Sequence, residues 1–181
     1  ARKLGQEGRI ASGLGNIGAV YKSWGKYDKA MKYFKKSLAI DKKLGQEGSI
    51  ATDLNNIGLV YKSWGQYDKA IKNYEEALDI ARKLGQEDGV ATCLNSIGLV
   101  YYSWGQYDKA IKNFKEALAI EKKLGREGGI ASFLFNIGMV YDSWGQYDKA
   151  IKNFKEALAI AEKLGLEVSG VATFLNNIGY V

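Results

Sequence analysis

The sequence has no histidine and no proline among its 181 residues, and it has a single cysteine. Without histidine the chain lacks the commonest general base and the commonest metal ligand of proteins. One thiol, Cys93, can form neither an internal disulfide nor a zinc site. No apolar run approaches the roughly 20 residues that cross a membrane. We therefore expect a cytoplasmic protein that is not an enzyme, with no cofactor, no metal and no membrane partner, in which Cys93 is reduced and partly buried.

The twenty acidic residues leave carboxylate catalysis as the remaining route to an enzyme. Four aspartates, however, recur at the same place in a repeated segment, each where a helix is predicted to begin: Asp28, Asp68, Asp108 and Asp148. A carboxylate at that place interacts favourably with the positive end of the helix dipole. A structural role therefore accounts for these residues better than catalysis does.

The net charge of +6 is concentrated in residues 9–48, where nine basic residues face three acidic ones. Four lysines in this range fall near one side of a predicted helix: Lys29, Lys32, Lys36 and Lys43. They form either a patch for an acidic partner or, as we favour, an ordinary solvated outer face. Elsewhere the basic residues are dispersed, whereas a phosphate backbone needs a continuous stripe, so nucleic acid is an unlikely partner.

A segment of forty residues recurs along the chain. The four tryptophans mark its period, because they lie forty positions apart: Trp24, Trp64, Trp104 and Trp144. A fixed period of this size indicates stacked structural repeats. We divide the chain into repeats at 8–47, 48–87, 88–127 and 128–168, with the end of a preceding repeat at 1–7 and the first helix of a fifth at 169–181. The whole is expected to be one solenoid and a fragment of a longer array.

Each repeat is predicted to be a helical hairpin. In residues 48–87, Leu54, Ile57, Gly58 and Tyr61 fall on one side of a helix and form a buried stripe. Gly65 ends that helix in the left-handed conformation, and a second helix follows. The predicted helices are 8–24, 27–44, 48–64, 67–84, 88–104, 107–124, 128–144, 147–165 and 169–181.

The pattern of these hairpins resembles the tetratricopeptide repeat. That repeat runs Trp, two residues, Leu-Gly, two residues, Tyr, then Ala, three residues, an aromatic residue and a closing Pro. This chain has Leu54, Ile57-Gly58, Tyr61, Ala70 and Tyr74 at those spacings. Leucine replaces the leading tryptophan, and no proline closes the repeat, so the second helix should run about two turns further. The long repeat is similar to those of kinesin light chains and Leu-Gly-Asn polarity proteins. The resemblance implies an all-α, right-handed superhelical solenoid of antiparallel helical hairpins that binds proteins.

Two glycine patterns need an explanation. One glycine recurs in the middle of every first helix, where it costs about 1 kcal/mol relative to alanine: Gly18, Gly58, Gly98, Gly138 and Gly179. We expect it to face the small alanine of the partner helix, such as Ala70, so that the two backbones approach. Residues 13–18 match the dinucleotide motif G-x-G-x-x-G. That motif requires a preceding strand, and because none is predicted here we expect no nucleotide.

The partner surface is predicted along the first helices, which line the inner groove of such a solenoid. One column of this groove is nearly constant and consists of Asn16, Asn56, Ser96, Asn136 and Asn177. Carboxamides can pair with the backbone of an extended peptide whatever its sequence, as in the asparagine ladder of some peptide-binding tetratricopeptide superhelices. The other candidate binding residues vary between copies and are Leu59, Leu99, Met139, Tyr102, Phe135, Asn55, Asn95 and Lys62.

Each of these columns also has a structural interpretation. The asparagines are equally well explained as framework residues satisfied by the local backbone, and the apolar strip as packing against the neighbouring repeat. The predicted function is nevertheless a scaffold that binds an extended or helical peptide in the groove. The alternative is a self-associating array whose copies stack end to end without a peptide ligand.

Overall fold

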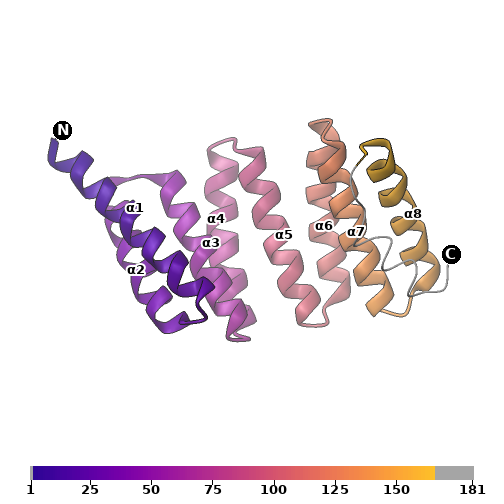
Figure 1. The fold of residues 1–181 in the computed structure, drawn as a ribbon, viewed down its shortest axis with the longest axis horizontal. Coiled ribbons are helices and arrows are strands. Elements are labelled where there is room, and N and C mark those ends of the chain that lie inside the picture. The colour runs from indigo at the N-terminus through magenta and orange to yellow at the C-terminus, as the bar shows by residue number, and fades with distance from the viewer. Residues whose placement is uncertain (1, 166–181) are drawn as a thin grey trace. The chain divides into compact units, whose positions relative to one another are not determined.

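The computed structural model describes residues 2–165, and this part of the chain contains eight helices and no strand (Figure 1). The helices are α1 (Arg2–Ser23), α2 (Tyr27–Leu44), α3 (Glu47–Ser63), α4 (Tyr67–Lys83), α5 (Glu87–Ser103), α6 (Tyr107–Lys123), α7 (Glu127–Ser143) and α8 (Tyr147–Lys163). The all-helical hairpin architecture is therefore confirmed. The predicted helix 169–181 and its residue Asn177 lie outside the described residues.

The start of α1 differs from the prediction. A helix was expected from residue 8, with residues 1–7 ending an earlier one, but α1 continues without a break from Arg2 to Ser23. Gly5 stays helical, which costs only about 1 kcal/mol relative to alanine. The continuous helix carries Glu7 to a position where its carboxylate accepts from the Lys43 Nζ at 3.0 Å. The other seven helices begin and end within two residues of the predicted bounds.

The chain divides into two compact units, residues 1–100 and 101–181, which are described separately. Unit 1 holds α1 to α4 and most of α5. Its hairpins pack through Met31 and Phe34 of α2 against Ile57 and Val60 of α3. Leu54 and Ile57 are 2% and 3% exposed, which confirms the buried stripe predicted for this repeat, whereas Ile17, the equivalent of Ile57 in α1, is 43% exposed.

Unit 2 holds the last turn of α5 with α6, α7 and α8. Its core is built in the same way, since Ala150 and Phe154 of α8 are buried against α7. The rings of Phe135 and Phe154 lie 5.4 Å apart between centroids. Aromatic contacts of this kind stabilise a hairpin beyond the area that they bury.

Glycines with positive φ end the helices, as predicted for Gly65. Gly65 has φ +68°, and its N–H donates to the Lys62 carbonyl at 2.9 Å while the N–H of Gln66 donates to the Tyr61 carbonyl at 2.9 Å. These bonds satisfy carbonyls that the helix end leaves open. Seven further glycines take the same conformation: Gly25, Gly45, Gly85, Gly105, Gly125, Gly145 and Gly165.

The mid-helix glycines have a different cause from the one expected. A Cβ placed on Gly58 would lie 2.8 Å from the ring of Tyr74, and one on Gly138 would lie 2.6 Å from the ring of Phe154. The group that excludes a side chain is thus the aromatic residue of the second helix, and not the small alanine that the sequence analysis proposed. At Gly18, Gly58 and Gly138 the missing side chain leaves room for a large ring close to the first helix.

Candidate peptide-binding groove

Two neighbouring pockets open along the first helices of unit 1. The first, called here the α1–α3 pocket, has a volume of about 200 Å³ and is lined by residues of α1, α2 and α3. The second, the α3–α5 pocket, has a volume of about 360 Å³ and is lined by α3, α4, α5 and Gln86, which precedes α5. Thr52 and Asn56 line both pockets, so the two hollows meet at one turn of α3. Successive repeat junctions therefore supply successive cavities on the same surface.

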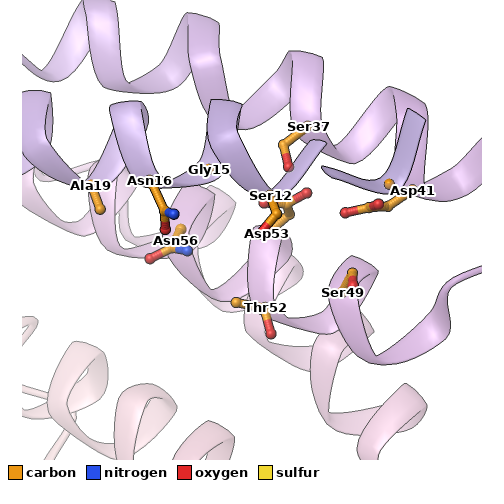
Figure 2. Close-up of a pocket in the computed structure, with 11 residues that line it drawn as sticks. Ser12, Gly15, Asn16, Ala19, Ser37, Asp41, Ser49, Thr52, Asp53 and Asn56 are labelled. Atoms are coloured by element: carbon orange, nitrogen blue, oxygen red, sulfur yellow. The ribbon is translucent and has the colours of Figure 1, made fainter. Parts of the chain in front are cut away.

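The asparagine column lies at these pockets. Asn16 is exposed and Asn56 half-buried, and both line the α1–α3 pocket, where Figure 2 draws their carboxamides at the same end. Neither carboxamide hydrogen-bonds to another side chain or backbone group of the described residues. Ser96 lines the α3–α5 pocket. Asn136, in unit 2, is half-buried and already makes an interaction of its own.

The neighbouring column is half-buried at Asn55, which lines the α3–α5 pocket and also contacts the interior. The Asn55 Nδ2 donates to the Ala51 carbonyl at 3.1 Å and lies 3.5 Å from the Cys93 Sγ. Cys93 is 1% exposed, more deeply buried than expected, and this burial raises the pKa of its thiol. In unit 2 the corresponding Phe135 lies against the core of α8. Asn95 is half-buried and also has a partner of its own.

The apolar column is divided between a pocket wall and the core. Leu59 forms part of the wall of the α3–α5 pocket, and Leu99 is half-buried. Met139 instead packs against Ala150 and Phe154 within its own hairpin. An accessible apolar wall is therefore present in unit 1, whereas the equivalent side chain in unit 2 contributes to the hairpin core.

The last two candidates lie near the ends of their first helices. Lys62 is half-buried, and this burial lowers the pKa of its ammonium group. The Tyr102 hydroxyl lies 2.8 Å from the Ser143 Oγ, and its ring lies 6.3 Å from that of Tyr107. Tyr102 is thus held in place within unit 2 by α7 and by the start of α6.

The structure adds three polar residues that the sequence analysis did not single out as a site. Asp41, Asp53 and Ser37 line the α1–α3 pocket and are 4%, 4% and 2% exposed. Burial, together with the neighbouring charge of Asp41, raises the pKa of Asp53 to about 6. Burial also raises the pKa of Asp41. One signal in the sequence could have revealed them. Ser37 stands where the other three repeats have an alanine, namely Ala77, Ala117 and Ala157.

The described residues do not hold a cluster of three or more carboxylate or thiol side chains that would ligate a metal ion. Within the same range no helix has the length and apolar character of a membrane span. The chemistry that the groove offers consists of carboxamides, hydroxyls, one apolar wall and a buried pair of carboxylates.

Comparison with known families matches tetratricopeptide repeat models to residues 11–44, 49–123 and 131–164. The chain belongs to the tetratricopeptide repeat family. Its fold is similar to that of a Podosopora anserina protein described as a kinesin light chain with nearly identical TPR-like repeats, which is 18% identical with a TM-score of 0.74 over 86% of this chain and 76% of that one. The predicted resemblance is thereby confirmed.

Two other solved structures are similar in fold. BtubC (BKLC) from P. vanneervenii is 28% identical, with a TM-score of 0.78 over 86% of this chain and 64% of BtubC. A Rap protein in complex with Competence and Sporulation Factor is 25% identical, with a TM-score of 0.77 over 86% of this chain and 44% of the Rap protein. The chain thus spans less than two thirds of the length of either one. Comparison with curated proteins gave no match.

Proposed function

We propose that this tetratricopeptide array is a non-catalytic scaffold that binds an extended or helical peptide along the first helices of unit 1. One observation carries the proposal: two pockets at successive repeat junctions meet at Thr52 and Asn56. A peptide that passes this turn of α3 reaches both pockets at once. The complex of a similar Rap protein with Competence and Sporulation Factor supports binding of a partner by this type of array.

The carboxamides of Asn16 and Asn56 would hold the peptide backbone. Each offers a donor and an acceptor, and each is available because no described protein group uses it. A net hydrogen bond contributes only about 0.5–1.5 kcal/mol, so two asparagines fix the register of a peptide rather than supply its whole affinity. The remaining affinity would come from side chains that enter the pockets, with Leu59 as the apolar wall of the larger one.

The test compares the wild-type protein with a double variant that carries both Asn16→Ala and Asn56→Ala. The probe is an arrayed library of random-sequence peptides, and thermal unfolding is measured in parallel. We expect peptide capture to be lost while Tm shifts by less than about 2 °C, because neither carboxamide holds the fold together.

A matched control uses asparagines on the second helices. Asn73 and Asn113 donate to the Lys69 and Lys109 carbonyls at 2.7 Å and 2.9 Å, and neither lines the α1–α3 or the α3–α5 pocket. Asn73→Ala with Asn113→Ala should leave capture unchanged. A wild-type protein that captures no peptide, or a groove variant that captures as well as the wild type, would contradict the proposal.

Self-association is the second candidate, and an exposed apolar face on α1 favours it. Ile10, Ile17 and Val20 are 50%, 43% and 62% exposed, although the equivalent residues of α3 are at most 9% exposed because α2 covers them. A second copy could cover the same face of α1. Light scattering over a concentration series tests this candidate, since a protein that stays monomeric at high concentration would exclude it.

A further inference from the structure

The junction between the first two hairpins differs chemically from the next junction along unit 1. It places Gly15, Ser37, Asp41 and Asp53 around the α1–α3 pocket. The next junction has Asn55, Ala77, Ala81 and Cys93 at the corresponding positions. Of these four positions only that of Ser37 is otherwise constant, with Ala77, Ala117 and Ala157 as its equivalents; the other three vary along the chain, and Glu121 is a second carboxylate at the position of Asp41. Relative to the next junction, three of the four differences add a polar side chain to the interior.

Two oxygens in this pocket have no hydrogen-bond partner. They are the Asp41 Oδ1 and the Asp53 Oδ2, which belong to side chains that are each 4% exposed. Buried carboxylates are normally paired with a cation or with several donors. In the described part of unit 1, no lysine or arginine lines the pocket to serve that purpose. Both oxygens have almost no solvent-accessible surface and the two aspartates interact with each other, so a donor that enters the pocket would pair with these oxygens after a small movement of the two side chains.

The place of the missing donor is open at Gly15. At the next junction the Asn55 Nδ2 lies 3.5 Å from the Cys93 Sγ and fills the equivalent space. A Cβ at Gly15 would lie 3.8 Å from the Asp53 Oδ1, which is ordinary contact distance, so a longer side chain at this position would reach the carboxylate. Glycine leaves that space to a ligand, and Figure 2 shows Asp53 in the middle of the pocket, with Asp41 toward one end and the Asn16 and Asn56 carboxamides toward the other.

We propose that the α1–α3 pocket binds the guanidinium group of an arginine side chain carried by the peptide in the groove. This inference rests on the proposed peptide-binding function and names one residue of the ligand. A guanidinium is planar and always charged, and its fork of donors matches carboxylate oxygens better than an ammonium does. The hydroxyls of Ser12 and Ser49, which also line the pocket, can accept from its remaining N–H groups.

An organic cation suits this pocket better than a metal ion. Calcium takes six to eight oxygen ligands and usually several carboxylates, whereas the pocket has two carboxylates and a volume of about 200 Å³. At neutral pH Asp53, with a pKa of about 6, is mostly ionised and so carries the charge that an arginine would neutralise. A bound guanidinium would also end the mutual repulsion of the two aspartates.

The first experiment tests the pocket without any peptide. Nα-acetylarginine methylamide is titrated into the full chain, and the carboxyl ¹³C signals of Asp41 and Asp53 are followed by NMR. The citrulline analogue, which has the same shape without the charge, is the matched probe. We expect both signals to shift with arginine only, and the pKa of Asp53 to fall in its presence. A lack of any shift, an equal shift with citrulline, or a shift with Ca²⁺ but not with arginine would overturn the proposal.

The second experiment uses variants. Gly15→Asn keeps both carboxylates but places an amide in the open space, so arginine should bind at least about tenfold more weakly. Asp53→Asn should have the same effect. Glu121→Gln is the control, because Glu121 occupies the position of Asp41 in α6 of unit 2 and is 7% exposed, yet lies outside the pocket. Unchanged arginine binding by Gly15→Asn and Asp53→Asn would place the arginine elsewhere.

The third experiment separates this inference from the proposed function. A peptide array with arginine at one fixed position is compared with the same array carrying citrulline there. Capture of both arrays equally well would leave the scaffold function intact and refute the arginine pocket. Preference for arginine that is lost in Asp53→Asn, but kept in Glu121→Gln, would support both.

Discussion

Replacing Asp53 by asparagine should make the protein more stable at neutral pH. The folded protein raises the pKa of this carboxyl to about 6, from an ordinary value of 3.8. Each pKa unit corresponds to about 1.4 kcal/mol, so the difference amounts to about 3 kcal/mol. The groups that face Asp53 are Asp41 and Ser37 of α2 and Ser12 of α1, and no cation offsets the charge among the described lining residues.

The sign of the effect follows from proton binding. The folded state binds the Asp53 proton more tightly than the unfolded state does, so this group stabilises the fold fully below pH 3.8. That contribution is lost as the pH rises through about 6. Asparagine has nearly the same shape and no charge. Asp53→Asn should therefore gain up to about 3 kcal/mol over the wild type near pH 7.5, and little or nothing near pH 4.

The assay is urea unfolding followed by tryptophan fluorescence, at about pH 4 and about pH 7.5. Asp79→Asn is the control, because Asp79 is exposed on α4 and far from the pocket, and its stability change should be small at both pH values. Stabilisation by Asp53→Asn that is equal at the two pH values would refute the role of ionisation. Destabilisation at neutral pH would show that the carboxylate already has a partner.

Three further changes test the remaining structural conclusions. Gly58→Ala places a Cβ 2.8 Å from the Tyr74 ring and should lower the free energy of unfolding by about 1–3 kcal/mol. Gly48→Ala, which meets nothing within 4 Å, should be neutral or stabilising by up to about 1 kcal/mol; chemical denaturation compares the two, and equal effects would contradict the contact. Cys93, at 1% exposure and with a raised pKa, should react with a thiol reagent only as fast as the protein opens, so rapid labelling of the native protein would contradict its burial. Ile17→Glu with Val20→Glu should abolish any concentration-dependent association seen by light scattering, and persistence of that association would exclude the α1 face.

The helices and their ends could be predicted from the sequence because each feature is repeated. Gly65 and its seven equivalents all occupy the left-handed conformation that closes a helix. The period of forty residues places the same apolar stripe on every first helix, so the burial of Ile57 could also be predicted. The start of α1 could not be predicted in this way. Gly5 has the same neighbours in sequence as Gly85, but Gly85 ends a helix whereas Gly5 remains helical.

The groove was harder to predict because adjacent residues point in different directions. Asn55 and Asn56 are equally plausible as binding residues in the sequence, yet successive residues are about 100° apart around a helix. Asn55 lies against Cys93 and lines the α3–α5 pocket alone, whereas Asn56 lines both pockets. The partner of Asn55 lies 38 positions away, and only packing of α3 against α5 brings the two together. Pattern within one helix therefore could not separate the two roles.

The carboxylate pair was missed for the same reason. Asp41 and Asp53 belong to different helices and to different columns of the repeat, so neither stands out as part of a cluster in the sequence. In a stack of nearly identical hairpins, a buried residue that is the same in every repeat is explained by the packing contacts that all repeats share. Burying two adjacent carboxylates lowers the free energy of unfolding, whereas burying the alanine and cysteine of the next junction does not. Departures of this costly kind are expected at functional sites, where local rules give way to binding. The pair of buried carboxylates at one junction, which the next junction lacks, is thus the strongest reason to look for the ligand at Asp53.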